Sequence, residues 1–235
     1  MRNIRITGPT PLHPKVLKAL SQQVQSHRSM PFRESINNLI KLLKPIFGTK
    51  QLPMLFSASG TGGLEASIVN IIQPRQNVLA IKIGYFGGRY AEIAKVFGAD
   101  VKLWDIPWGQ GIDVSELRKK IRSFKKLDAV LLTHNETSTG VINPLQAIAK
   151  IINEESNALI LVDGISSVGA TYIEMEKWSI DVVVTASQKA LMAPAGLTII
   201  TASDRALEIA RENIKSNYYF NFNKMQTAVK EGMTT

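Results

Sequence analysis

The chain has 235 residues, 45% of them hydrophobic, which suits one large globular domain with a sizeable core. It contains no cysteine, which excludes disulfides, thiolate zinc sites and a cysteine nucleophile within this chain. No apolar run approaches the roughly 18 residues of a membrane span, and no signal-peptide core follows the first residues, so we expect a cytoplasmic protein without a membrane partner.

The formal net charge of +9 raises nucleic acid as a partner. The basic residues are scattered, however, and their densest cluster, residues 119–126, is predicted to lie on a surface helix. No recognisable nucleic-acid module accompanies this cluster, so a solvated helix face is the better interpretation, and we expect no nucleic-acid partner. A basic surface also suits anionic substrates and a phosphorylated cofactor.

The first 50 residues are predicted to form an irregular arm and two helices that precede the main domain, residues 51–235. Residues 8–11, Gly-Pro-Thr-Pro, cannot lie inside a helix. Pro14 suits the first turn of one helix, and a second helix is predicted from about Ser35 to a stop at Gly48.

From residue 52 onward, short β-branched runs alternate with amphipathic helices. The strands are predicted at residues 52–56, 78–83, 101–106, 129–132, 158–163, 180–185 and 196–201, and the helices at 62–72, 87–97, 114–124 and 144–153. Asp113 and Glu116 fit a capping box for the third of these helices. The alternation predicts an α/β fold whose mostly parallel sheet is covered by helices on both faces, with ligands bound beyond the carboxyl ends of the strands. Residues 213–235 have a helical start and then weak periodicity.

Lys189 lies just after the predicted buried strand 180–185, where a lysine is unusual. Partial desolvation disfavours the charged form of an amine, which suits it to attack a carbonyl as in Schiff-base enzymes. The structural alternative is a lysine that reaches solvent at the end of a strand.

Two other strand ends complement this lysine. Asp163 closes the strand 158–163, and Ser57–Gly63 leads from a strand into a glycine-rich turn and a helix. That turn is neither a dinucleotide-binding nor a Walker loop, and it suits either a phosphate or a helix N-terminus that needs small residues. A lysine, an acid for a pyridinium nitrogen and a helix N-terminus for a phosphate are the parts that pyridoxal 5'-phosphate (PLP) needs. The sequence therefore indicates a PLP site.

Two further segments follow predicted strands. Residues 134–139 carry six hydrogen-bonding side chains, more than the structural turn that would otherwise explain them requires. Within this run His134 could act as an acid or base, but no neighbour in the sequence identifies a partner for it. An aromatic residue in the segment 85–89 could lie on a cofactor ring, although for this segment alone ordinary core packing is the favoured interpretation.

Four segments together resemble the class V aminotransferases: Ser-Ala-Ser-Gly-Thr-Gly at 57–62, Thr-His-Asn-Glu-Thr-Ser-Thr-Gly-Val at 133–141, Leu-Val-Asp-Gly-Ile-Ser-Ser at 161–167 and Ser-Gln-Lys-Ala-Leu at 187–191. They are most similar to the serine-glyoxylate, alanine-glyoxylate and serine-pyruvate enzymes, and the likeness runs from Gly8 to about Thr201. The resemblance implies the large domain of a PLP-dependent transferase of fold type I. It also implies a homodimer that moves an amino group from serine or alanine to glyoxylate or pyruvate.

The resemblance assigns a role to each matching residue. Lys189 would form the imine with PLP and shuttle the substrate's Cα proton, and Asp163 would keep the pyridine nitrogen protonated. Phe86 would stack on the ring, Ser138 would bond its phenolic edge, and Gly8 would lie near the substrate carboxylate. The residues that would hold the phosphate are Ser59, Gly60, Thr61, Ser187 and Gln188.

Two features qualify the resemblance. The related cysteine desulfurases usually have histidine before the lysine and a cysteine downstream, whereas this chain has Gln188 and no cysteine. The family also continues beyond residue 235, with a Thr-Pro segment that reaches the neighbouring subunit's cofactor and a small C-terminal domain whose arginine binds the substrate carboxylate. Three alternatives stay open: a cysteine desulfurase-like PLP lyase, a truncated, catalytically incompetent PLP-binding domain, and a nucleic-acid-binding protein that uses its basic surface.

Overall fold

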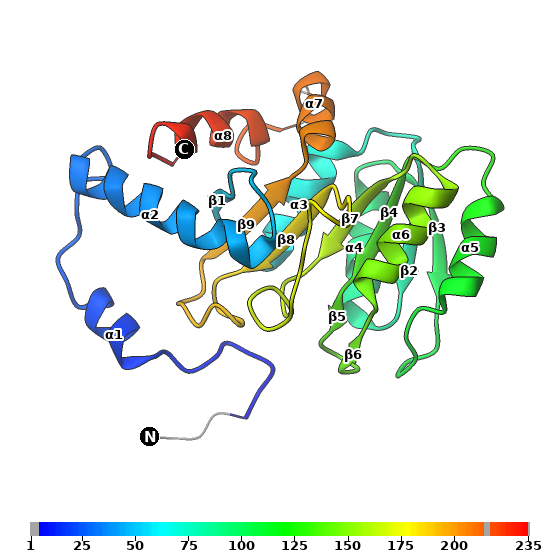
Figure 1. Ribbon diagram of the computed structural model, residues 1–235, viewed down its shortest axis with the longest axis horizontal. Coiled ribbons are helices and arrows are strands. Elements are labelled where there is room, and N and C mark those ends of the chain that lie inside the picture. Colours follow the sequence, from blue (N-terminus) through cyan, green and yellow to red (C-terminus); the bar gives the residue numbers. More distant parts are fainter. Residues whose placement is uncertain (1–4, 214–216, 235) are drawn as a thin grey trace.

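The computed structural model describes residues 5–213 and 217–234 (Figure 1). Its main feature is a seven-stranded sheet in the order β1-β9-β8-β7-β4-β2-β3. The strands are β1 (Met54–Ser57), β2 (Asn77–Lys82), β3 (Asp100–Asp105), β4 (Ala129–Thr133), β7 (Leu159–Asp163), β8 (Val182–Ala186) and β9 (Leu197–Ala202). The five strands from β8 to β3 run parallel, whereas β9 is antiparallel to both of its neighbours. The predicted mostly parallel sheet is confirmed.

Helices cover both faces of this sheet. They are α1 (Pro14–Leu20), α2 (Met30–Phe47), α3 (Gly60–Ile71), α4 (Tyr85–Val96), α5 (Val114–Arg122), α6 (Leu145–Glu155), α7 (Asp204–Glu212) and α8 (Phe222–Lys230). In Figure 1, α2 and α6 lie in front of the sheet, and α3 and α4 lie behind it. Because both faces are covered, β4, β7 and β8 are buried at every residue, which explains their unbroken apolar runs. No helix of the described residues is long and apolar enough to cross a bilayer.

Three elements differ from the prediction. Helix α2 begins several residues early, because the Ser29 side chain accepts a hydrogen bond from the amide of Phe32 and a proline is tolerated in a first turn. Asn213, where a helical start was predicted, is the C-cap of α7, a helix that was not predicted, and residues 214–216 lie outside the described residues. The polar run after β4 forms a small hairpin of β5 (Asn135–Glu136) and β6 (Val141–Ile142).

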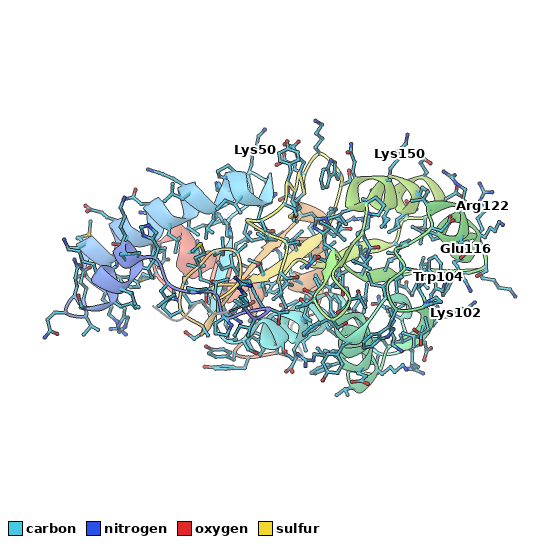
Figure 2. All side chains as sticks on the ribbon, turned by 90° about the horizontal axis from the view of Figure 1, so that it is seen from below. Lys50, Lys102, Trp104, Glu116, Arg122 and Lys150 are labelled. Carbon is cyan, nitrogen blue, oxygen red and sulfur yellow. The ribbon has the colours of Figure 1, made fainter. Side chains whose placement is uncertain are left out.

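The predicted basic helix is α5, and Asp113 caps it as expected by accepting hydrogen bonds from the amides of Ser115 and Glu116. Figure 2 shows Glu116 and Arg122 of this helix at the same end of the molecule as Lys102 and Trp104 of β3. Arg122 forms an ion pair with Glu155 of α6. Part of the positive charge of α5 is therefore neutralised by ion pairs within the fold. Exposed ion pairs contribute little to stability.

Candidate functional site

The lysine and the aspartate predicted from the sequence lie at the carboxyl ends of neighbouring parallel strands. Asp163 is the last residue of β7, paired in register with Thr133 of β4 and Val184 of β8. Lys189 follows β8 in the turn after Ala186. In Figure 1 the N-terminal arm and the β5–β6 hairpin both lie along the lower edge of the sheet. Such edges are where open parallel sheets bind ligands.

The N-terminal arm is held against Lys189. The Lys189 Nζ donates a hydrogen bond to the carbonyl of Thr7 at 2.6 Å, and the amide of Thr10 donates to the carbonyl of Gln188 at 3.0 Å. At Gly8, φ is +116° and a Cβ would lie 2.9 Å from Cδ of Lys189, so a larger residue would displace the lysine. The structure thus brings Gly8 and Lys189 together, although 180 positions separate them in the chain.

Burial shifts the protonation of both ionisable groups. The Asp163 carboxyl is 3% exposed, and its burial raises its pKa to about 7. The negative charge of Glu136 acts in the same direction, whereas the Ile165 amide, which donates to the carboxylate at 3.0 Å, and the charges of Arg89 and Lys189 oppose it. Desolvation lowers the pKa of Lys189, against the attraction of Asp163. A cationic partner would therefore favour ionisation of Asp163.

The turn between β1 and α3 presents a helix N-terminus. Ser59 caps α3, its Oγ accepting from the Gly62 amide at 3.2 Å. Gly60 is buried, and a Cβ there would lie 2.6 Å from Cδ1 of Ile165. The first amides of a helix lack helical partners and carry the positive end of its dipole. This turn therefore suits a phosphate dianion.

Arg89 of α4 adds positive charge beside this turn. Its Nη1 donates to Oγ1 of Thr61 at 2.9 Å, and its guanidinium carbon lies 5.1 Å from the centroid of the Phe86 ring. Arg89 takes part in no ion pair within residues 5–213 and 217–234. A guanidinium without a carboxylate partner fits a dianionic ligand. Sequence reasoning gave Arg89 no role, although its place three residues after Phe86 puts both on one helix face.

The two residues before Lys189 are placed differently from each other. The Ser187 hydroxyl donates to the carbonyl of Pro194 at 2.6 Å and accepts from the amide of Leu197 at 3.3 Å, so it braces the loop after β8. The Gln188 Oε1 is buried and has no hydrogen-bond partner among the described residues. A half-turn of the amide exchanges its oxygen and nitrogen, so this side chain can present either an acceptor or a donor to a ligand.

Phe86 and Ser138 come from different elements and meet through Glu136. The Phe86 ring is half-buried and lies edge-on to Tyr85, with 5.4 Å between centroids. The Ser138 hydroxyl donates to Oε1 of Glu136 at 2.7 Å and accepts from the Tyr85 amide at 3.0 Å. Sequence reasoning missed Glu136, and its being the only acid in the run 134–140 was the available signal.

His134 follows β4 and is buried, and burial lowers its pKa to about 4. The imidazole is therefore neutral at pH 7. Its Nδ1 has no hydrogen-bond partner among the described residues. Neither the sequence nor the described structure identifies a partner with which His134 could act as an acid or base.

The donor and acceptor groups at this edge fit PLP. Asp163 offers a buried carboxyl that forms no ion pair within the described ranges and can face a cationic ring nitrogen. Lys189 offers an amine whose lowered pKa increases its neutral fraction. The N-terminus of α3 together with Arg89 offers the positive field that a phosphate needs. The buried oxygen of Gln188 has no hydrogen-bond partner among the described residues, so it can bond a ligand.

Comparisons with known proteins agree with this chemistry. Residues 6–231 match the family model described as Aminotransferase class-V. The serine–glyoxylate aminotransferase of Methylorubrum extorquens is 35% identical over 87% of this chain and 52% of its own length, and the L-aspartate–glyoxylate aminotransferase of Paracoccus denitrificans is 33% identical over 95% and 58%.

Among solved structures, the alanine–glyoxylate aminotransferase of Nostoc sp. superposes with a TM-score of 0.90 at 31% identity, over 95% of this chain and 60% of that one. The chain thus spans between half and about three-fifths of the length of these relatives. It belongs to the class V aminotransferases, PLP-dependent transaminases whose fold type I architecture it shares.

Proposed function

We propose that this chain is the PLP-binding large domain of an aminotransferase that moves an amino group from serine or alanine to glyoxylate or pyruvate. The observation that carries the proposal is the pairing of Lys189, whose pKa is lowered by burial, with the buried Asp163 at adjacent strand ends. Relatives named for glyoxylate as acceptor support that part of the proposal, while the donors in their names vary between serine, aspartate and ureidoglycine.

The organisation of the whole protein is part of the same proposal. The proposed division is an N-terminal arm with helices, residues 1–50, and a PLP-binding large domain, residues 51–235. The side chains of Ile36, Ile40 and Phe47 of α2 lie in the main hydrophobic core, which supports a firm attachment. A homodimer and a cytoplasmic location, both expected from the sequence, remain predictions.

Bound PLP supplies an electron sink in conjugation with the amino group of the substrate. The protein's own residues supply the rest. Asp163, when ionised, holds positive charge on the ring nitrogen, and Lys189 Nζ in its neutral form accepts the proton from the substrate Cα and later returns one. Desolvation of the amine increases the fraction that can accept this proton at neutral pH.

The other proposed ligands would orient the cofactor and enclose it. Phe86 would cover one face of the ring, and Ser138 would bond its phenolic edge. The phosphate would be held by Ser59, Gly60, Thr61 and Gln188. Ser187, also predicted as a phosphate ligand, donates its hydroxyl proton to Pro194 and would instead support the loop that carries Gln188. Gly8, which the arm holds against Lys189, would lie beside the substrate carboxylate; a side chain at this position would displace Lys189.

The test is an amino-transfer assay on the 235-residue chain with PLP. Serine, alanine and aspartate would each be supplied as donor with glyoxylate as acceptor, and serine and aspartate also with pyruvate, and the glycine or alanine formed would be quantified. The proposal predicts glycine from glyoxylate with serine or alanine as donor, and none from the Lys189→Ala variant. Release of sulfide from cysteine without amino transfer would instead favour the PLP lyase, and PLP binding with no turnover of any pair would favour the incompetent domain.

A further inference from the structure

Glu136 is a fully buried carboxylate in the β5–β6 hairpin, with 0% of its surface exposed. No ion pair compensates it within residues 5–213 and 217–234. Burying a charged carboxylate is unfavourable unless its oxygens receive hydrogen bonds or a helix dipole faces it. Glu136 has both, and they come from two separate parts of the candidate site.

The first set of donors is the N-terminus of α4. The amide of Phe86 lies 3.1 Å from Oε2 and 3.3 Å from Oε1 of Glu136, and the amide of Gly87 lies 3.1 Å from Oε2. These are orphan amides of a first helical turn, and they present the positive end of the dipole to the carboxylate. The backbone of the predicted ring-stacking residue is therefore bound directly to Glu136.

The second set of donors belongs to Ser138. Its amide donates to Oε1 of Glu136 at 3.1 Å, and its hydroxyl donates to the same oxygen at 2.7 Å. The hydroxyl also accepts a hydrogen bond from the amide of Tyr85 at 3.0 Å. Its single proton is used in the bond to Glu136, and one of its two oxygen lone pairs remains to accept a hydrogen bond from a ligand. Since all these contacts are donors to the carboxylate, the ionised form is the one that satisfies them.

The packing at Gly84 is a second observation that the backbone fits closely around the Glu136 side chain. Its φ is 167°, an extended conformation that any residue can adopt, so backbone freedom does not require glycine here. A Cβ at this position would lie 2.5 Å from Cγ of Glu136 and 2.5 Å from Oγ of Ser138. Glycine is needed because the side chains of Glu136 and Ser138 occupy that space.

We propose that ionised Glu136 is a positioning residue that locks Ser138 and the first turn of α4, which carries Phe86, into one unit shaped to receive PLP. This inference rests on the proposed function, since it assumes that Ser138 and Phe86 contact the cofactor. None of the side-chain hydrogen bonds of Glu136 reaches the phosphate turn or Lys189, so its hydrogen bonds act on the cofactor site through Ser138 and Phe86, beside the effect of its charge on Asp163.

The test uses Glu136→Gln, which replaces one acceptor oxygen by an NH2 that cannot accept the converging N–H groups. Gly84→Ala is the second variant, because it displaces the carboxylate without changing its charge. Asp113→Asn is the matched control: it removes another helix-capping carboxylate, on α5, away from the candidate site. For each protein the readouts are the dissociation constant for PLP, the circular dichroism induced in the bound cofactor, and the melting temperature without PLP.

The inference predicts that Glu136→Gln and Gly84→Ala each raise the PLP dissociation constant by at least about tenfold, the effect of losing one hydrogen bond to a charged group, and reduce the induced dichroism. Asp113→Asn should lower the melting temperature and leave both cofactor readouts unchanged. Wild-type values of the dissociation constant and dichroism in either site variant would overturn the inference. If Glu136→Gln does not fold, Gly84→Ala decides alone. Failure of the wild-type chain to bind PLP would instead count against the proposed function.

Discussion

Replacing Asp163 with asparagine should stabilise the cofactor-free protein at high pH. The carboxyl has its pKa raised from 3.8 to about 7, so the folded state holds its proton more tightly than the unfolded state does. Below pH 4 both states are protonated and Asp163 has no effect. As the pH rises from about 4 to 7 the unfolded state ionises first, and the folded state becomes less stable by an increasing amount.

The size of the effect follows from the shift. Each pKa unit corresponds to about 1.4 kcal/mol, so a shift of roughly three units destabilises the fold by about 4 kcal/mol above pH 7. Between pH 5 and pH 8 the penalty grows by about 2 to 3 kcal/mol. Asparagine carries no charge and keeps an oxygen to accept the Ile165 amide, so the variant should lose this pH-dependent penalty while it keeps the local hydrogen bond.

The assay is urea unfolding of wild type and Asp163→Asn at pH 5 and pH 8, without PLP. The wild type should lose about 2 to 3 kcal/mol of unfolding free energy over this range relative to the variant. Asp113→Asn, at an exposed cap, should follow the wild type. An identical pH dependence in wild type and Asp163→Asn would refute the reasoning, because it would mean that Asp163 is already ionised in the folded protein.

Two further predictions concern packing and a buried ion pair. Gly63→Ala should destabilise the fold by about 1 to 3 kcal/mol, since a Cβ on this helix would overlap the Thr198 hydroxyl and crowd the sheet. Arg205→Met should lower the free energy of unfolding by about 2 to 3 kcal/mol, because the buried Asp181 would lose its ion-pair partner. The loss is moderate because the Arg205 side chain is 44% exposed. Chemical denaturation measures both effects.

Each of these has a matched control. Gly88→Ala on α4 adds a Cβ that meets nothing closer than 3.5 Å, so it should not destabilise. Arg122→Met removes one of two arginines that pair with Glu155; Arg122 is 63% exposed and Arg118 keeps its pair, so stability should change by less than about 1 kcal/mol. A Gly63→Ala variant as stable as Gly88→Ala, or an Arg205→Met variant as stable as Arg122→Met, would show that the packing or the ion pair has been misjudged.

The sheet and the places of Lys189 and Asp163 at its edge were predictable because local sequence signals indicate them. The strands that end at Asp163 and near Lys189 are short apolar runs buried on both faces, and parallel strands place their carboxyl ends together. The α3 turn was predictable from its glycines and its capping serine, Ser59. Helix α7 could have been predicted too, since Ser203 caps it and apolar residues recur at helical spacing.

The remaining parts of the site depend on contacts between distant segments. A run of polar residues favours a turn, and nothing local indicates that Glu136 binds amides fifty positions earlier in α4. The arm likewise places Gly8 on Lys189 through hydrogen bonds that no periodicity encodes. The bracing of the loop after β8 by the Ser187 hydroxyl also depends on the final fold.

The most direct test of the account is to trap PLP on the chain. The 235-residue protein would be mixed with PLP, reduced with borohydride, digested, and its peptides mapped by mass spectrometry, with Lys189→Ala as the control. The account predicts a reduced pyridoxyl group on Lys189 and no specific adduct in the variant. An adduct that is absent, or that is spread over surface lysines such as Lys50 and Lys150 with Lys189 unmodified, would contradict it.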